Sequence, residues 1–98
     1  MGKIRISYAY RLREITGKSY EILEIKTPTS VQDLIDYLNS NYGSKFCEEI
    51  GLQVSDFGER SSFYQTFVDG KRISDTEKSD PLIRNESEVT FLPITSGG

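Results

Sequence analysis

The amino-acid sequence predicts a single α+β domain in which a mixed β-sheet packs on one main α-helix. Two patterns predict it: apolar residues alternate with polar ones near the N-terminus, and a later stretch shows helical apolar spacing. The length supports it too, because 98 residues with 36% hydrophobic side chains suffice for one compact core. We therefore expect one domain over residues 1–94, followed by a flexible tail over residues 95–98.

Residues 3–12 have the period of two that is typical of a half-buried strand. Gly17-Lys18 then predicts a turn, and residues 19–26 predict a second strand that pairs with the first as an antiparallel hairpin. The neighbours Ile22 and Leu23 interrupt the alternation, so we expect either a bulge or a strand covered on both faces. The apolar face of the first strand consists of Ile4, Ile6, Tyr8, Tyr10 and Leu12.

The main helix is predicted to begin at Ser30, a plausible N-cap, and to end at Gly43. Asp33 places a negative charge near the positive end of the helix dipole. The predicted apolar face of the helix consists of Val31, Leu34, Ile35, Leu38 and Tyr42.

The second half of the chain is predicted to return to β-structure. Phe46 and Ile50 indicate one or two further helical turns, and residues 53–62 read as a polar loop. Strands are expected at residues 63–68, 71–73 and 88–94, with a tight turn at Asp69-Gly70 between the first two. In the last strand Val89 and Phe91 face one way, whereas Thr90 and Leu92 face the other. The polar segment between these strands has one apolar island, Pro81-Leu82-Ile83.

This order of elements, β-β-α followed by three strands, predicts how the layers assemble. The helix covers one face of the sheet, and the first and last strands lie side by side at its centre. This arrangement is the β-grasp, or ubiquitin-like, fold.

Composition excludes several function classes. Twelve Lys and Arg against fifteen Asp and Glu give a net charge of −3, which argues against a nucleic-acid binder. The chain has no His and one Cys, so the commonest general base, a disulfide and a multi-Cys zinc site are all absent. Cys47 is followed by Glu48 and Glu49, which oppose a thiolate, and we interpret it as an ordinary helix residue. We expect no catalytic residue, no metal site and, without an apolar N-terminal block, a cytoplasmic protein.

The end of the sequence, Thr95-Ser96-Gly97-Gly98, is the strongest candidate site. A terminal Gly-Gly lets a catalytic channel close around the backbone and reach the carboxylate, which ATP can activate as an acyl-adenylate. The alternative is a chain end without a function.

Four segments together resemble the MoaD/ThiS group of sulfur carriers, and within it the archaeal MoaD-type and small archaeal modifier proteins. Residues 8–17 resemble the family's first segment, residues 30–35 its helix start, and residues 67–70 its strand and Asp-Gly turn. Residues 88–98 resemble its closing strand with a terminal Gly-Gly. Where the family often has Gly before this strand, the chain has Glu86, so we expect a different turn there.

The resemblance implies a ubiquitin-like protein that is a substrate and carrier and not an enzyme. An E1-like enzyme, holding ATP and Mg²⁺, would adenylate Gly98 and recognise Gly97, Ser96 and Thr95. Gly98 would then form an isopeptide bond with lysines of target proteins, or a thiocarboxylate used in molybdenum cofactor synthesis or tRNA thiolation.

Two alternatives to this reading stay open. The chain could be the small, MoaD-type subunit of molybdopterin synthase, acting only as sulfur donor to the large subunit, or a β-grasp interaction module. We expect the free protein to be a monomer that binds neither nucleic acid nor membrane. We also expect it to dock on its activating enzyme through apolar residues of the open sheet face, with Leu23, Ile25 and Leu92 as candidates.

Overall fold

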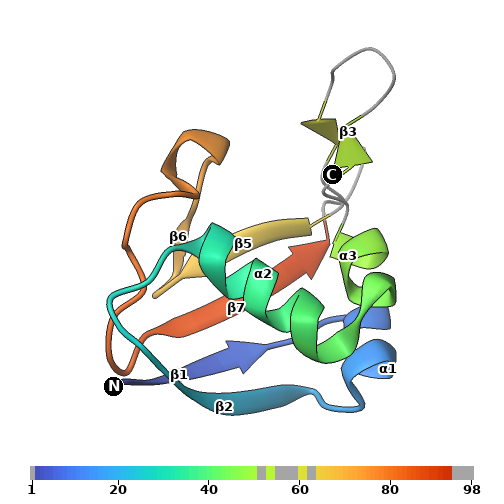
Figure 1. Cartoon of the computed structure of the whole chain (residues 1–98), viewed down its shortest axis with the longest axis horizontal. Coiled ribbons are helices and arrows are strands. Elements are labelled where there is room, and N and C mark those ends of the chain that lie inside the picture. The colour runs from blue at the N-terminus through green and yellow to red at the C-terminus, as the bar shows by residue number, and fades with distance from the viewer. Residues whose placement is uncertain (1, 51–52, 55–59, 62–63, 94–98) are drawn as a thin grey trace.

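The computed structural model describes residues 2–50, 53–54, 60–61 and 64–93 (Figure 1). A five-stranded mixed sheet has the strand order β2-β1-β7-β5-β6. β1 pairs antiparallel with β2 and parallel with β7, so the first and last strands lie side by side at the centre, as predicted. The strands are β1 (Gly2–Ser7), β2 (Tyr20–Ile25), β5 (Tyr64–Val68), β6 (Lys71–Arg72) and β7 (Glu88–Pro93).

The predicted first strand is too long. β1 ends at Ser7, and a short helix, α1 (Arg11–Thr16), replaces the remainder. Tyr10 precedes this helix with a φ of 54° and is 70% exposed, whereas Leu12 is fully buried. The alternation misleads here because the buried Leu12 fits it, although Leu12 is buried on a helix, where it shares one face with the buried Thr16 four residues later.

Both expectations for the second strand are wrong. β2 pairs residue for residue with β1, from Gly2 opposite Ile25 to Ser7 opposite Tyr20, so it contains no bulge. It is not covered on both faces either, since Tyr20 and Ile22 are 51% and 61% exposed. Leu23 and Ile25 point to the other side and pack against the core.

The main helix, α2 (Val31–Tyr42), is where the sequence predicts it. The Asp33 backbone N–H donates to Ser30 Oγ at 3.1 Å, which confirms the N-cap. Gly43 ends the helix with a φ of 86°, and its N–H donates to the Asn39 carbonyl at 2.8 Å. Figure 1 shows α2 crossing one face of the sheet. Its four buried residues, Val31, Leu34, Ile35 and Leu38, share the core with Ile4, Ile6, Val89 and Phe91.

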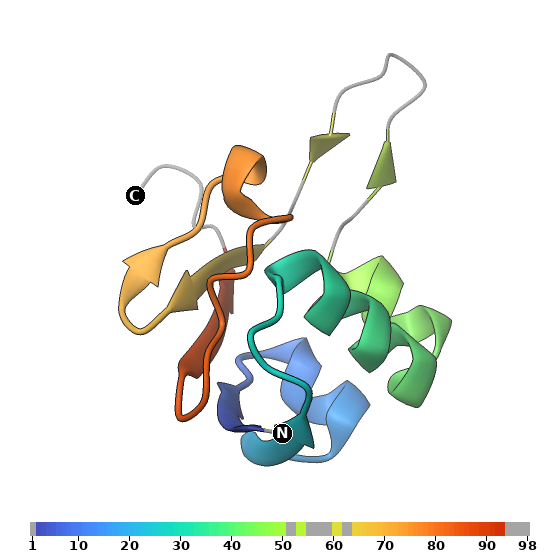
Figure 2. The same ribbon diagram turned by 60° about the vertical axis from the view of Figure 1, so that its left-hand side comes forward.

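A third helix, α3 (Ser44–Ile50), confirms the helical turns predicted from Phe46 and Ile50, both of which are buried. The polar loop predicted for residues 53–62 is partly wrong. Its described residues form two short antiparallel strands, β3 (Gln53–Val54) and β4 (Arg60–Ser61), which stand apart from the main sheet in Figure 2.

The segment between β6 and β7 is held by its apolar residues. Ile73 is buried, a short 3₁₀ helix η1 (Asp75–Glu77) follows, and Ile83 is fully buried and bridges to Thr29. The predicted Asp69-Gly70 turn is present, with φ angles of 53° and 84°. Glu86 has a φ of 69°. In the turn before β7, a glutamate therefore adopts a positive φ, a conformation that glycine adopts more readily.

Candidate functional site

The predicted reactive terminus lies outside the described residues. Thr95, Ser96, Gly97 and Gly98, and the expected boundary between residues 94 and 95, all follow Pro93, where the described part of the chain ends. The structure therefore defines the strand that carries the tail and the surfaces around it.

β7 is held on both sides. β7 pairs antiparallel with β5 through residues 89–93. It pairs parallel with β1 through residues 88–90. Val89 and Phe91 are fully buried in the core that they share with the buried residues of α2 and α3. The first half of β7 is therefore paired on both sides, whereas its last residues, nearest the tail, pair with β5 alone. A strand paired on both sides resists local opening more than an edge strand does, so the first half of β7 anchors the tail to the sheet.

The last pair of this ladder is linked to two helices. Tyr64 lies opposite Pro93, and its hydroxyl donates to Glu49 Oε2 of α3 at 2.5 Å. Arg11 of α1 lies 3.9 Å from the other oxygen of the same carboxylate. Burial, together with this carboxylate, raises the pKa of Tyr64 well above its usual value, so the phenol stays protonated and remains a donor. None of these three residues was predicted, because their contact joins parts of the chain that no local pattern relates.

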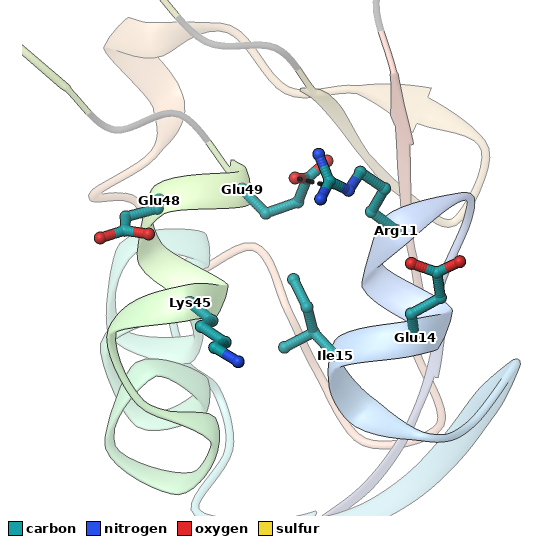
Figure 3. Close-up of a pocket in the computed structure, with 6 residues that line it drawn as sticks. All are labelled: Arg11, Glu14, Ile15, Lys45, Glu48 and Glu49. Atoms are coloured by element: carbon teal, nitrogen blue, oxygen red, sulfur yellow. Dashed lines mark ion pairs between the residues drawn. The ribbon is translucent and has the colours of Figure 1, made fainter.

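A groove of about 610 Å³ lies between α1 and α3 beside this link (Figure 3). The Arg11 and Glu49 side chains point toward each other across it, whereas Glu48 points away. The described residues contain no group of three or more His, Cys, Asp or Glu side chains arranged to hold a metal ion. The groove is lined by Arg11, Glu14, Ile15, Lys45, Glu48 and Glu49.

Cys47 is a partly exposed free cysteine on α3, an ordinary position on a helix, as predicted. No helix in the described part of the chain is both long enough and apolar enough to cross a membrane.

The sheet face opposite α2 is the second candidate surface. Leu92 is 42% exposed there, so this one of the three candidate docking residues is accessible, as predicted. Leu23 and Ile25 were wrong because the regular β1–β2 register turns them toward the core. The exposed apolar residues of β2 are instead Tyr20 and Ile22, and counting the alternation from Tyr20 would have identified them.

Charged side chains border the apolar part of this face. The Arg5 guanidinium lies over the Tyr20 ring, 4.6 Å from its centroid, and Lys3 Nζ is 3.7 Å from Glu24. At the other margin Arg72 pairs across the strands with the half-buried Phe67. The face thus carries exposed apolar residues on β2 and β7, with the charged side chains of β1 between them. Such a mixture of apolar and charged side chains is suited to binding a protein.

Comparison with known proteins gives the family. The ThiS family model matches residues 6–98, whereas no match was found among curated proteins. The fold matches that of small archaeal modifier protein 1 from Methanosarcina acetivorans, with a TM-score of 0.73 and 22% identity over 100% of this chain and 98% of that one.

Two further solved structures share the fold. CysO from Amycolatopsis orientalis, solved in complex with BexX, has a TM-score of 0.65 and 21% identity over 97% of this chain and 99% of that one. Urm1 from Trypanosoma brucei has a TM-score of 0.65 and 19% identity over 99% and 96% of the two chains.

These likenesses confirm the ubiquitin-like β-grasp fold, and they agree with the prediction that the protein is not an enzyme, since ThiS-type proteins and small archaeal modifiers are non-catalytic carriers. The described strands and helices, and a family match that runs to the terminal Gly97-Gly98, lead to one conclusion: the chain belongs to the ThiS family of ubiquitin-like sulfur carriers.

Proposed function

We propose that this protein is a ubiquitin-like modifier and sulfur carrier whose Gly98 is adenylated by an E1-like enzyme. The observation that carries the proposal is the family match, which extends over residues 6–98 and so includes the terminal Gly97-Gly98. The fold shared with a small archaeal modifier protein supports conjugation as one outcome. A location in the cytoplasm agrees with the single cysteine of the chain.

The chemistry would use the C-terminal carboxylate as the reacting group. One carboxylate oxygen of Gly98 attacks the α-phosphorus of ATP, and pyrophosphate leaves. A lysine amine of a target protein then displaces AMP and forms an isopeptide bond, or a sulfur nucleophile supplied by a partner displaces AMP on the way to a thiocarboxylate. ATP and Mg²⁺ belong to the activating enzyme, and this chain supplies the acyl group alone.

The tail and the sheet have separate tasks in this proposal. Gly97, Ser96 and Thr95 have no side chain or a small one, so a narrow channel of the activating enzyme can enclose them. The open sheet face, with Leu92 on the strand that leads into the tail, would dock on the same enzyme. The complex of CysO with BexX shows that one protein of this fold does bind a partner protein.

Two partner classes follow from the two outcomes. A modifier needs target proteins with accessible lysines, whereas a MoaD-type carrier needs the large subunit of molybdopterin synthase. Mass spectrometry of the protein from its own cells separates them. A sulfur-for-oxygen mass increment at Gly98 indicates the carrier, and Gly-Gly remnants on lysines of other proteins indicate the modifier.

Adenylation itself is tested by ATP–pyrophosphate exchange with the cognate E1-like enzyme. Deleting Gly98, or changing Gly97→Trp, should abolish exchange, because the carboxylate stops short or the indole blocks the channel. Neither change should move the melting temperature, since Phe91 is the last core residue in the described part of the chain. Full exchange activity without Gly98 would refute both the carrier and the modifier, and leave an interaction module.

A further inference from the structure

The outer edge of β2 has backbone groups free to pair. β2 is a terminal strand of the five-stranded sheet (Figure 1), and among the described residues it pairs with β1 alone. The Tyr8 N–H donates to the Ser19 carbonyl at 2.9 Å. Because hydrogen-bonded residues alternate along an antiparallel ladder, β1 engages the odd-numbered residues of this strand. The N–H and C=O groups of Tyr20, Ile22 and Glu24 therefore point to the open edge.

The side chains at this edge do little to block another strand. Natural edge strands commonly carry a charged residue or a proline at the middle, which prevents pairing. The middle of this edge is Ile22, which is 61% exposed, and its neighbour Tyr20 is 51% exposed. The edge is therefore suited to accept another strand. The residues of β2 itself are complementary to a second β2 strand.

We propose that β2 pairs antiparallel with β2 of a second copy of this chain, about a two-fold axis that passes through Ile22. Only even-numbered residues offer free backbone groups, so they must face one another across the axis. Ile22 then lies opposite the partner's Ile22, and Tyr20 lies opposite the partner's Glu24. In a two-fold contact each copy uses the same edge, so no β2 edge is left for a third copy and the assembly stops at a dimer. The two five-stranded sheets then form one continuous sheet of ten strands.

Charge complementarity selects this register. The Arg5 guanidinium lies 4.6 Å from the Tyr20 ring centroid, so the partner's Glu24 meets a cation there, and symmetry forms the pair twice. The present partner of Glu24 is Lys3, and both side chains of that ion pair are 68% exposed. An exposed ion pair of this kind contributes little to stability, so Glu24 can leave Lys3 and bind the partner's Arg5 at a small cost in free energy.

If one β2 strand is shifted by two residues along the other, the partner's Glu24 no longer lies opposite Tyr20 and Arg5. A shift in one direction places Glu21 opposite the partner's Glu21. A shift in the other direction places the partner's Lys26 against Tyr20 and Arg5, which brings like charges together. In the proposed register Lys18 and the partner's Lys26 face each other, but both lie beyond the ends of the paired strands.

The contact is small, because one six-residue strand from each copy forms it. It should therefore fall below the roughly 1,200 Å² of stable interfaces and give a weak dimer. Sedimentation velocity over a series of concentrations up to the near-millimolar range should show a monomer at low concentration and a dimer at high concentration.

Ile22→Lys should abolish the dimer, because it places two ammonium groups at the two-fold axis. Since Ile22 is exposed, the melting temperature should hardly change. Leu92→Lys is the matched control: it makes the same kind of change on the same sheet face, but β7 lies two strands away from the edge. This variant should dimerise like the wild type.

A charge exchange tests the register. Arg5→Glu and Glu24→Arg should each weaken association, and the double variant should restore it. A wild-type protein that stays monomeric at every concentration would overturn the proposal, and would leave the edge to an extended segment of another protein. Equal loss of association in Ile22→Lys and Leu92→Lys, or no restoration in the double variant, would overturn it as well.

Discussion

Glu21 holds together three parts of the chain that are far apart in sequence. Its carboxylate accepts hydrogen bonds from the Tyr8 hydroxyl at 2.5 Å and from the Tyr42 hydroxyl, and Lys18 Nζ lies 3.5 Å away. The Glu21 side chain is 10% exposed. Tyr8 follows β1 and Tyr42 ends α2, so this carboxylate fastens the first hairpin to the main helix.

Glu21→Gln should therefore destabilise the protein by about 2 kcal/mol. Hydrogen bonds to a charged group contribute roughly 1.5–3 kcal/mol, and bonds between neutral groups contribute roughly 1 kcal/mol less. Both hydroxyls donate to Glu21 Oε2, so the amide oxygen of glutamine can still accept them, but without the negative charge. Its NH₂ group would replace Oε1, which lies 3.5 Å from Lys18 Nζ, and a donor there repels the ammonium group. For a domain of this size the change should lower the melting temperature by about 8–16 °C, measured by circular dichroism at neutral pH. Glu24→Gln is the matched control on the same strand. Because Glu24 is 68% exposed, its loss should change the stability by less than about 0.5 kcal/mol.

The pH dependence of this difference identifies its cause. Burial disfavours the Glu21 carboxylate, but hydrogen bonds from Tyr42 and Tyr8 outweigh burial and hold its pKa below the usual 4.5. A lowered pKa in the folded state means that the stabilisation is complete above about pH 4.5 and is lost as pH falls through the folded value. The gap between wild type and Glu21→Gln should therefore narrow in acid. Equal melting temperatures for Glu21→Gln and Glu24→Gln at neutral pH would refute this reasoning.

Three further predictions concern the core, a turn and the docking face. Leu34→Ala should cost about 2–5 kcal/mol in chemical denaturation, because the Leu34 side chain is 1% exposed; an unchanged midpoint would contradict the packing of α2 on the sheet. Glu86→Gly should raise the melting temperature by a few degrees, since a φ of 69° is strained for glutamate; a lower value would show that the side chain compensates for this strain. Leu92→Lys should raise the KM for the carrier in pyrophosphate exchange and leave its melting temperature unchanged. An unaltered KM would move the docking surface elsewhere.

Where apolar spacing and end signals coincide, the sequence predicts the fold correctly. Ser30 and Gly43 enclose a stretch with helical spacing, and α2 has these bounds. The Asp69-Gly70 turn likewise follows from residues that readily adopt positive φ angles.

The predictions failed where two structures suit one pattern. Leu12 fits both the alternation of a strand and the spacing of a helix, and the positive φ of Tyr10, which ends the extended chain before α1, has no signal in the sequence. Leu23 was expected on the open face because the paired Ile22 and Leu23 suggested a change of face, yet the strand alternates regularly.

One part of the candidate site could be predicted from the sequence, and another part could not. Gly97-Gly98 is visible in the sequence because its chemistry depends on residue type alone. The link from Tyr64 through Glu49 to Arg11 depends on three elements meeting at one end of the sheet, so only the fold reveals it.

The position of β7 connects the fold to the proposed chemistry. A terminus that must enter another protein's nucleotide site has to be long and unobstructed, yet the strand that bears it must not peel from the sheet when the tail is bound. An edge strand would open locally at low cost, whereas the first half of β7 is paired with both β1 and β5, and two β7 residues are fully buried in the core. Freeing it would break the central pairing of the sheet and therefore approach the cost of unfolding the whole domain. The parallel pairing of the first and last strands thus allows the tail to be handled by an enzyme while the docking face keeps its shape.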